Sequence, residues 1–417
     1  MKRKIIAGMI GLIILLGISF VGCSSEDVGL TQAPKSSTLM NETSTGSDSS
    51  GSISTIVLSS VEGSLLDASE LFTERDLEQS ADLSDASYIE LNNGEDVVID
   101  EEGVYVLSGK AENVTVIVEA DDEAKVQLVL DGVSIKNDDS PAIYVKSADK
   151  VFVTLTDSDN YMEVSDSYKA DGDVNLDAVI FSKEDLVLNG TGILEIISTT
   201  GNGITSKDDL KVTGGTYSIT SLEDGLEAND SIRIAGGDIT INSDKDAVHS
   251  ENEDDSSLGY IYILDGTLNI SAADDGIQGS TIVQIDGGVI NIETSTEGIE
   301  GTTIQINGGE IDIYATDDGI NASEKGDGDI VIEVNGGTIN VEVRGGDVDG
   351  FDSNGNIIIN GGTINVVCPT QAPSGPFDSM GTAQLNGGTV TVNGQVITEI
   401  IESKMGGMDG PGGKPGR

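Results

Sequence analysis

Acidic residues return at one position of a repeated turn, and this row is the feature of the sequence with the most evident chemistry. Each turn reads acid, Gly or Ala, then an apolar residue, and the acids are Asp224, Asp246, Asp275, Glu297, Asp318 and Asp349. Three residues later each turn carries a second polar side chain, namely Glu227, His249, Gln278, Glu300, Asn321 or Asp352. A residue type that returns at the same place in every repeat is expected to stack on its equivalents.

A second acidic row begins upstream. The segments starting at Ser182 and Ser206 read Ser-Lys-acid-Asp-Leu, and the segment starting at Ala228 aligns with them as Ala-Asn-Asp-Ser-Ile. This alignment stacks Glu184, Asp208 and Asp230, places Asp185 and Asp209 beside them, and puts Lys183 and Lys207 next to the row. Ser231 stands where the first two segments have Asp185 and Asp209, so the stack of these second acids ends there.

Stacked carboxylates favour a bound cation. Equivalent residues of adjacent strands lie about 4.8 Å apart, and two bare carboxylates at that distance repel by roughly 1 to 4 kcal/mol, depending on exposure. Calcium relieves this repulsion, since Ca–O distances of about 2.3–2.6 Å let one ion bridge two such groups. Magnesium fits less well because it requires tighter octahedral geometry. Zinc is disfavoured by the single His and the lack of a Cys cluster.

We therefore predict Ca²⁺ as the cofactor. The predicted ligands lie among Glu184, Asp185, Asp208, Asp209, Asp224, Glu227, Asp230, Asp246, Asp275, Glu297, Asp318 and Asp349. The alternative interpretation assigns these acids to the turns alone, because Asp and Asn side chains bond their own backbone there.

Paired glycines mark the elements that position the rows. A Gly-Gly or Asp-Gly pair followed by alternating apolar residues occurs eight times, and the second glycines are Gly215, Gly237, Gly266, Gly288, Gly309, Gly337, Gly362 and Gly388. They stand 21 to 29 residues apart. The alternation is that of a strand; a second apolar strand precedes each pair, and the acidic turn leads into a third. Three short strands in about 22 residues predict one coil of an all-β parallel β-helix.

The rival all-β architectures are a β-sandwich and a propeller. A sandwich needs no fixed period, and a propeller blade needs about 40 residues. In the β-helix, glycines at the corners permit positive φ. The extra residues of the longer repeats are predicted to form outward loops at Glu251 to Gly259 and Ser323 to Asp329.

The N-terminal residues read as an export signal. Lys2, Arg3 and Lys4 precede an apolar run, and the segment Phe20-Val-Gly-Cys23 resembles a bacterial lipobox. We predict a lipoprotein signal peptide at residues 1–22, lipidation at Cys23, and a flexible Ser/Thr-rich tether at 23–66. The β-helix then occupies 67–403, before a disordered Gly-rich tail at 404–417. With lipidation or with an uncleaved anchor, the protein is expected on the extracellular face of the bacterial cell membrane.

Residues 68–83 favour a helix. We predict a short N-terminal capping helix there, with Leu71, Phe72, Leu77 and Leu83 covering the open end of the first coil. A solenoid without such a lid leaves an unpaired strand edge. A well-capped solenoid is expected to be a monomer.

The composition excludes some partners and favours others. Lys and Arg number 21 against 73 Asp and Glu, and the net charge of −52 repels nucleic acid. The chain has no Trp, and its nine Tyr are scattered, which disfavours the aromatic platform that neutral sugars use. Lipidation of Cys23 leaves Cys368 without a partner, so no disulfide framework is expected.

The stretch from Val104 to about Asp246 resembles a bacterial cell-surface carbohydrate-binding β-helix family, first described as a cellulose- and polygalacturonate-binding protein of clostridia. The segments that carry the resemblance include Tyr105-Val-Leu-Ser-Gly109, Val129-Leu-Asp-Gly-Val133, Asp177-Ala-Val-Ile-Phe-Ser-Lys-Glu-Asp-Leu186 and Gly203-Ile-Thr-Ser-Lys-Asp-Asp-Leu210. This family is related in fold to family 9 pectate lyases. The resemblance implies a right-handed parallel β-helix, bound calcium, and polysaccharide binding without clear catalysis.

Three functional hypotheses follow. The first is a binding module in which calcium on the acidic rows takes up the carboxylates of a polyuronate such as polygalacturonate. The second is a calcium-dependent polysaccharide lyase with Lys183 or Lys207 as base, although these lysines also serve simply to neutralise their acidic neighbours. The third is a surface adhesin or scaffold with a protein partner. We favour the first.

Overall fold

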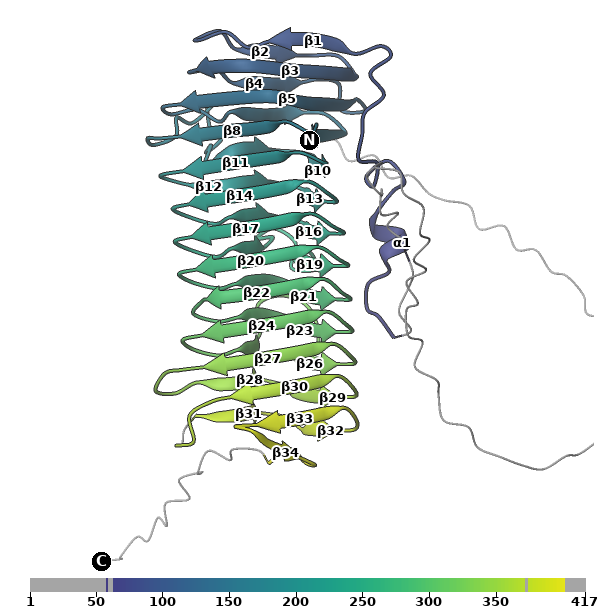
Figure 1. Cartoon of the computed structure of the whole chain (residues 1–417), viewed down its shortest axis with the longest axis vertical. Coiled ribbons are helices and arrows are strands. Elements are labelled where there is room, and N and C mark those ends of the chain that lie inside the picture. Colours follow the sequence, from purple (N-terminus) through teal and green to yellow (C-terminus); the bar gives the residue numbers. More distant parts are fainter. Residues whose placement is uncertain (1–57, 59–62, 372–373, 402–417) are drawn as a thin grey trace, which may run out of the picture. The chain divides into compact units, whose positions relative to one another are not determined.

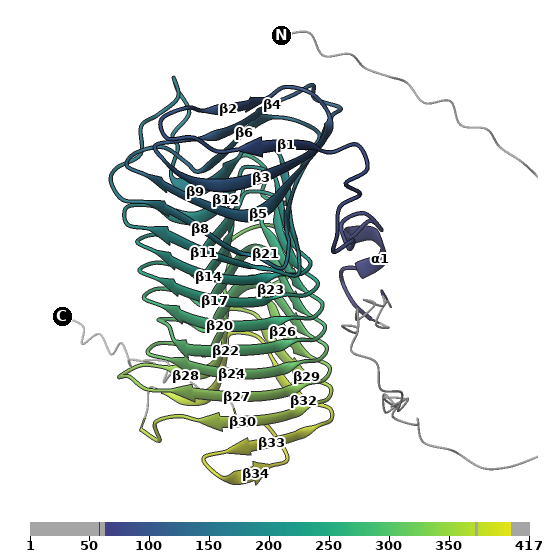
Figure 2. The ribbon, with the colours of Figure 1, turned by 45° about the horizontal axis from the view of Figure 1, so that its top comes forward.

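Each glycine repeat folds into three short strands, and successive repeats wind into a parallel β-solenoid. The structure is a computed structural model that describes residues 58, 63–371 and 374–401 of the 417-residue chain. Figure 1 shows the strands stacked in chain order from β1 to β34, and the tilted view in Figure 2 shows the chain turning from one face of the coil to the next. The predicted signal peptide, Cys23, most of the tether and the tail lie outside the described residues. No helix within the described ranges is long and apolar enough to span a bilayer.

The strands form three parallel sheets, one strand of each sheet per coil. The pre-glycine sheet holds β1 (Ser87–Glu90), β3 (Gly103–Glu112), β5 (Lys125–Asn137), β7 (Lys150–Leu155), β10 (Asp185–Gly190), β13 (Asp209–Val212), β16 (Ser231–Ile234), β19 (Tyr260–Ile263), β21 (Ile277–Ile285), β23 (Ile299–Ile306), β26 (Val331–Val334), β29 (Asn356–Ile359) and β32 (Ala383–Leu385).

The post-glycine sheet follows the glycine pairs. It holds β8 (Asp159–Val164), β11 (Ile193–Ser198), β14 (Thr216–Ser221), β17 (Asp238–Ser243), β20 (Thr267–Ala272), β22 (Val289–Thr294), β24 (Glu310–Ala315), β27 (Thr338–Val343), β30 (Thr363–Val367), β33 (Thr389–Val392) and the antiparallel β34 (Gln395–Ile397). 

The ladder sheet follows the acidic turns. It holds β2 (Val97–Ile99), β4 (Val116–Glu119), β6 (Ile143–Ser147), β9 (Ala178–Ser182), β12 (Asn202–Ser206), β15 (Leu226–Ala228), β18 (Val248–Ser250), β25 (Ile320–Ala322), β28 (Asp349–Ser353), β31 (Gly375–Ser379) and the first residues of β21 and β23.

Inward-facing apolar residues stack in register through the interior. In the pre-glycine sheet, Ile232 pairs with Ile261, Ile261 with Val283, and Val283 with Ile304. All four side chains are 0% exposed. Alternate residues therefore form continuous apolar columns, and burial of each column stabilises the winding by the hydrophobic effect. This parallel register confirms the predicted solenoid and rules out a sandwich and a propeller.

The two glycines of a pair have different tasks. Gly309 has φ +92°, a conformation that side chains with a Cβ rarely adopt. A Cβ on the preceding Gly308 would lie 2.3 Å from the carbonyl oxygen of Asp286 in the neighbouring coil. The second glycine therefore provides the turn geometry, and the first permits the close approach of adjacent coils.

The longer repeats place their extra residues in loops, as predicted. The loop from Glu251 to Gly259 is exposed along most of its length, and so is the loop from Ser323 to Asp329. The two loops meet, because the backbone N–H of Asp327 donates to the carbonyl of Ser256 at 2.8 Å.

The N-terminal helix forms, but its predicted position is wrong. Helix α1 (Ala68–Leu71) begins after Asp67, whose side chain accepts the N–H of Ser69. Phe72 packs against Tyr262 of β19, with ring centroids 6.2 Å apart, and Leu71 and Leu77 join this cluster. Leu83 stays 42% exposed. The apolar residues therefore cover the side of the pre-glycine sheet and not the end of the first coil.

The segment from Gly63 to Gln79, here called the strap, crosses the strands from β23 to β7. At one end, Gln305 bonds to the carbonyl of Gly63 and the N–H of Leu65. At the other, the side chain of Gln79 accepts the N–H of Gly190 at 2.9 Å. Its first residues, predicted to belong to the tether, are thus part of the packed structure.

Candidate cation-binding ladder

The acidic turns stack at one corner of the solenoid. Asp224, Asp246, Asp275, Glu297, Asp318 and Asp349, here called the ladder, occupy the turns that lead into the ladder sheet. The strand residues that follow pair in register: Glu227 with His249, His249 with Gln278, Gln278 with Glu300, Glu300 with Asn321, and Asn321 with Asp352. We call these residues the companion column. The predicted alignment of both sets is therefore correct.

Ladder side chains tie adjacent coils together. The backbone N–H of Asp246 donates to Asp224 Oδ1 at 3.1 Å, and that of Asp275 donates to Asp246 Oδ1 at 2.8 Å. The same bond joins Glu297 to Asp275 at 3.1 Å and Asp349 to Asp318 at 2.7 Å. One oxygen of each accepting carboxylate thus supports the turn of the next coil. This differs from the predicted bond of a turn residue to its own backbone.

The remaining oxygens gather in small groups. Within the described residues, four sets of three side chains bring one ligand atom each to within 4.8 Å of the others. The sets are Asp224, Asp246 and His249; Asp246, Asp274 and Asp275; Asp275, Glu297 and Glu300; and Asp349, Asp352 and Asp378. Every set includes at least one ladder residue.

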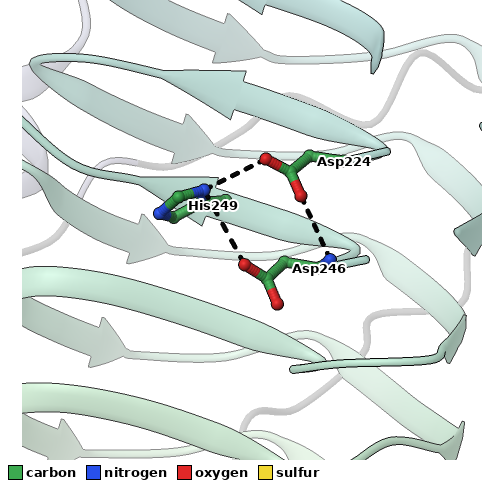
Figure 3. Close-up of side chains that lie close together, drawn as sticks. All are labelled: Asp224, Asp246 and His249. Atoms are coloured by element: carbon green, nitrogen blue, oxygen red, sulfur yellow. Dashed lines mark hydrogen bonds and ion pairs between the residues drawn. The ribbon is translucent and has the colours of Figure 1, made fainter. Parts of the chain in front are cut away.

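His249 provides the positive charge of the first set (Figure 3). Its Nδ1 lies 3.1 Å from Asp224 Oδ2 and 3.7 Å from Asp246 Oδ2. Burial lowers the pKa of His249, but the hydrogen bond and charge of Asp224 together with the charge of Asp246 outweigh it and raise the pKa to about 9. At neutral pH this set therefore contains its own cation.

Glu300 of the third set also has a basic partner. Its Oε2 lies 2.5 Å from Lys325 Nζ, and Gln278 Nε2 donates to it at 2.7 Å. Burial raises the pKa of Glu300, but the bonds from Lys325, Gln278 and Ser323 hold it below its usual value. Glu297 accepts the Asn321 side-chain N–H at 3.0 Å. Its pKa is raised by burial and then by the charge of Glu300.

The fourth set lacks an internal cation. Among the described residues, none of Asp349, Asp352 and Asp378 forms an ion pair with Lys, Arg or His. Burial is the main cause that raises the pKa of Asp349 to about 7 and that of Asp352 to about 6, and neighbouring carboxylates add to it. Asp378 pairs with Asp352 in register.

Within the described ranges, two buried oxygens at or near this set have no hydrogen-bond partner. Asp349 Oδ1 is one and Asn321 Oδ1 is the other, and both residues are 8% exposed. The side-chain nitrogen of Asn321 donates to Glu297 and Glu300 of the preceding coil. The side-chain oxygen of Asn321 therefore remains available to the following coil, where Asp352 pairs with Asn321 in register. Buried oxygens without donors are costly, and a cation satisfies them.

The upstream row stacks as predicted, and two of its acids, Asp185 and Asp209, are paired with basic residues. Leu186 pairs in register with Leu210, which places the preceding Asp185 next to Asp209, and Asp209 pairs with Ser231. Lys150 Nζ lies 3.4 Å from Asp185, and Arg233 lies 2.6 Å from Asp209.

The other residues of this row have separate surroundings. Burial and the neighbouring acids raise the pKa of Asp208 to about 7, and Asp230 accepts the side-chain N–H of Asn252 at 2.6 Å. Lys207 Nζ lies 3.1 Å from Glu227, while Lys183 acts on Glu184 through charge alone. No member of this row belongs to the four sets found in the described part of the chain.

Sequence reasoning missed two features. Asp378 follows the sequence Gly-Pro-Phe, so it lacks the acid-Gly signal, although its place after Phe377 matches that of Asp352 after Phe351. The residues before the later glycine pairs also form a column of side-chain hydrogen bonds, in which each Asn donates to the Asp or Asn of the preceding coil at 2.7 to 2.9 Å. Its members are Asp286, Asn307, Asn335, Asn360 and Asn386. The recurring Asn-Gly-Gly was the available signal.

Comparison with known proteins places the chain in a family. The sequence model of the carbohydrate-binding domain-containing protein family matches residues 93–348 and 302–395, which together cover more than half of the chain. A carbohydrate-binding domain-containing protein of Acetivibrio thermocellus is 44% identical over 185 residues, which are 44% of this chain and 65% of that protein. The match thus spans less than two thirds of the relative's length.

A solved structure of a polysaccharide lyase-like protein from C. thermocellum, a gadolinium derivative, is also similar. It is 30% identical, with a TM-score of 0.45, over 53% of this chain and 92% of that one. A TM-score this low transfers no property. The family model, in contrast, matches the sequence of the solenoid over more than half of the chain. The chain therefore belongs to the carbohydrate-binding domain-containing protein family.

Proposed function

We propose that this protein binds an acidic polysaccharide through calcium held on the ladder. The family supports carbohydrate binding. Binding of an acidic polysaccharide through calcium is supported by the stack of carboxylates in successive coils. Three of these acids, Asp349, Asp352 and Asp378, lie close together and have no basic partner among the described residues.

The residues of this set fit calcium. All donors are carboxylate or amide oxygens, the ligand type that calcium prefers, and one atom of each acid lies within 4.8 Å of the others. The unpartnered oxygens of Asp349 and Asn321 add acceptors that no donor in the described part of the chain satisfies. We assign Asp349, Asp352 and Asp378 as the ligands, with Asn321 as a further candidate. The first set fits less well because His249 already neutralises it.

Calcium bound at this set supplies positive charge and coordination positions that a uronate carboxylate can fill. Without such charge, a protein of net charge −52 repels a polyanion. Because ladder positions repeat from coil to coil, the assigned site lies at one end of a row of carboxylates, and a polymer whose own carboxylates repeat can follow that row. This match favours a polyuronate over an isolated acidic sugar.

The proposed place of action is the outer face of a bacterial membrane. The lipobox-like Phe20-Val-Gly-Cys23 supports a lipid anchor, and the Ser/Thr-rich segment after it supports a tether. We expect the protein to act there as a monomer.

Calorimetric titration of calcium into the EDTA-stripped protein tests the proposal, followed by titration of polygalacturonate into the same sample. We expect calcium to bind and polygalacturonate to bind only after calcium is present. Polygalacturonate binding of equal strength in EDTA contradicts the proposal. The same samples test the lyase hypothesis, because β-elimination leaves an unsaturated, ultraviolet-absorbing end, which we expect to be absent.

A further inference from the structure

The outer surface of the post-glycine sheet is hollowed across several neighbouring strands. One part has a volume of about 240 Å³ and crosses β22, β24, β27 and β30. A second part, of about 560 Å³, crosses β11, β14, β17 and β20, and reaches Thr294 at the end of β22. The two parts are lined by different residues of β22. The first part, here called the groove, crosses its four strands along the axis of the solenoid.

An irregularity of the sheet opens the groove. Register between β20 and β22 shifts after Ile270, so that Ser271 pairs with Thr294 and Glu293 is left over as a bulge. Pairing of β22 with β24 then stops at Ile292. A bulge bends the strand and ends local pairing, so Glu293 has no in-register partner on β24.

Tyr314 stands in this opening as a partly exposed aromatic side chain. It pairs in register with Glu342, which pairs with Val367. Its hydroxyl bonds to no other group in the described residues, so ring and hydroxyl are available to a ligand. Tyrosine combines an apolar face with a polar tip, which suits a pyranose ring with its apolar C–H face and hydroxyl rim.

Amide and carboxylate side chains flank the ring at strand spacing. The column beside Tyr314 contains Asn291, Asp312, Asn340 and Asn365, paired in register. Asn340 already donates to Asp312 Oδ1 at 2.7 Å, which leaves further donors and acceptors free for sugar hydroxyls. Adjacent strands lie about 4.8 Å apart, close to the length of one sugar residue in an extended glycan.

The charge around the groove indicates an uncharged occupant. Glu293, Asp312 and Glu342 line it, and the nearby Arg344 is paired with Glu342 at 2.5 Å. The groove therefore repels uronates, and no set of three metal-ligating side chains lies in it. We propose that this groove binds an uncharged glycan lying along the solenoid axis, about one sugar residue per coil, with Tyr314 as its stacking platform. This proposal rests on the family assignment and is independent of calcium on the ladder.

Calorimetry in EDTA with cellohexaose, mannohexaose, xylohexaose and hexagalacturonate tests the proposal. EDTA removes any contribution from calcium, so failure here is distinct from failure of the ladder proposal. We expect at least one uncharged hexasaccharide to bind the wild-type protein, and hexagalacturonate not to bind. Tyr314→Ala is expected to weaken that binding about tenfold or more, as loss of an aromatic anchor does, whereas Tyr314→Phe retains it within about threefold.

Tyr161→Ala is the matched control, because Tyr161 also faces outward from the post-glycine sheet, on β8, but lies outside the groove. It is expected to bind like the wild type. Circular dichroism checks that each variant keeps its strand signal. The proposal is overturned by absence of binding to all three uncharged sugars, by equal loss in both alanine variants, by unchanged affinity of Tyr314→Ala, or by preference for hexagalacturonate.

Discussion

At the scale of single residues, the ladder divides into positions with and without an internal cation. His249 neutralises Asp224 and Asp246, and Lys325 neutralises Glu300. Asp349, Asp352 and Asp378 have no such partner among the described residues. Asp349 Oδ1 and the nearby Asn321 Oδ1 also have no hydrogen-bond partner there. The same residue type at equivalent positions thus has different chemistry because its neighbours differ.

We predict that the double variant Asp349→Asn, Asp352→Asn loses calcium affinity by about tenfold or more, since ligand charge sets calcium affinity in oxygen sites. Calorimetric titration of calcium measures the change. The control, Asp238→Asn with Glu310→Gln, removes the same charge from two exposed positions of the post-glycine sheet. Equal loss in both double variants assigns the effect to net charge and contradicts a local site.

At the scale of elements, glycine pairs determine how closely adjacent coils approach. We predict that Gly308→Ala destabilises the protein by about 1–3 kcal/mol, the usual cost of overpacking, because its Cβ would meet a backbone oxygen at 2.3 Å. Thermal unfolding followed by circular dichroism measures this. Gly346→Ala is the control, since its Cβ meets nothing within 4 Å. A similar shift in both variants refutes the close-approach explanation.

The strap is held by a buried charge cluster. Asp76 is 0% exposed and lies 3.3 Å from both Lys150 and Lys211. Burial raises the pKa of Asp76, but the hydrogen bond from Thr73 and the two lysines hold it below its usual value. The carboxylate therefore stays charged and compensates Lys211, which is itself buried.

We predict that Asp76→Ala destabilises the protein by about 3–5 kcal/mol, because it leaves a buried lysine without its counter-charge. Urea unfolding gives the free energy, and limited proteolysis reports whether the strap detaches first. Asp85→Ala removes an exposed acid nearby and is expected to be neutral. Resistance of the Asp76→Ala strap to protease, with unchanged stability, would refute the role of the cluster.

At the scale of the whole molecule, the ladder acids and His249 both make the folded state less stable as pH rises. The folded-state pKa is about 6 for Asp246 and Asp352 and about 7 for Asp318 and Asp349, against an ordinary value of 3.8. The folded state then binds more protons than the unfolded state between about pH 4 and 7, so stability falls as pH rises through this window. The His249 contribution is complete below 6.5 and is lost as pH rises through about 9.

We therefore predict that the EDTA-treated protein melts at a lower temperature at pH 9 than at pH 5. Added calcium replaces the protons and raises the melting temperature more at pH 9 than at pH 5. Thermal scans at both pH values, with EDTA or calcium, check this. A melting temperature that rises with pH in EDTA contradicts the assigned pKa directions. Magnesium at equal concentration is the control for ionic strength.

The sequence by itself determined the winding. Glycine pairs, alternating Ile and Val, and a period near one coil specify a parallel solenoid because local turn geometry and strand periodicity repeat identically in each unit. The same period placed the ladder acids in register, since residues at one repeat position must stack. A helix was predicted over residues 68–83, and only its first turn, Ala68–Leu71, is helical.

Only the tertiary structure decided what repetition does not encode. The strap lies on the side of the solenoid because Asp76, Phe72 and Gln79 contact partners there that are 74 to 190 residues away in the sequence, at positions with no repeat. Three features each depend on coils that differ from their neighbours. They are the neutralisation by His249 and Lys325, the set of acids completed by Asp378, and the bulge at Glu293 beside Tyr314. Regular features follow from the period, whereas the sites arise where neighbouring coils differ.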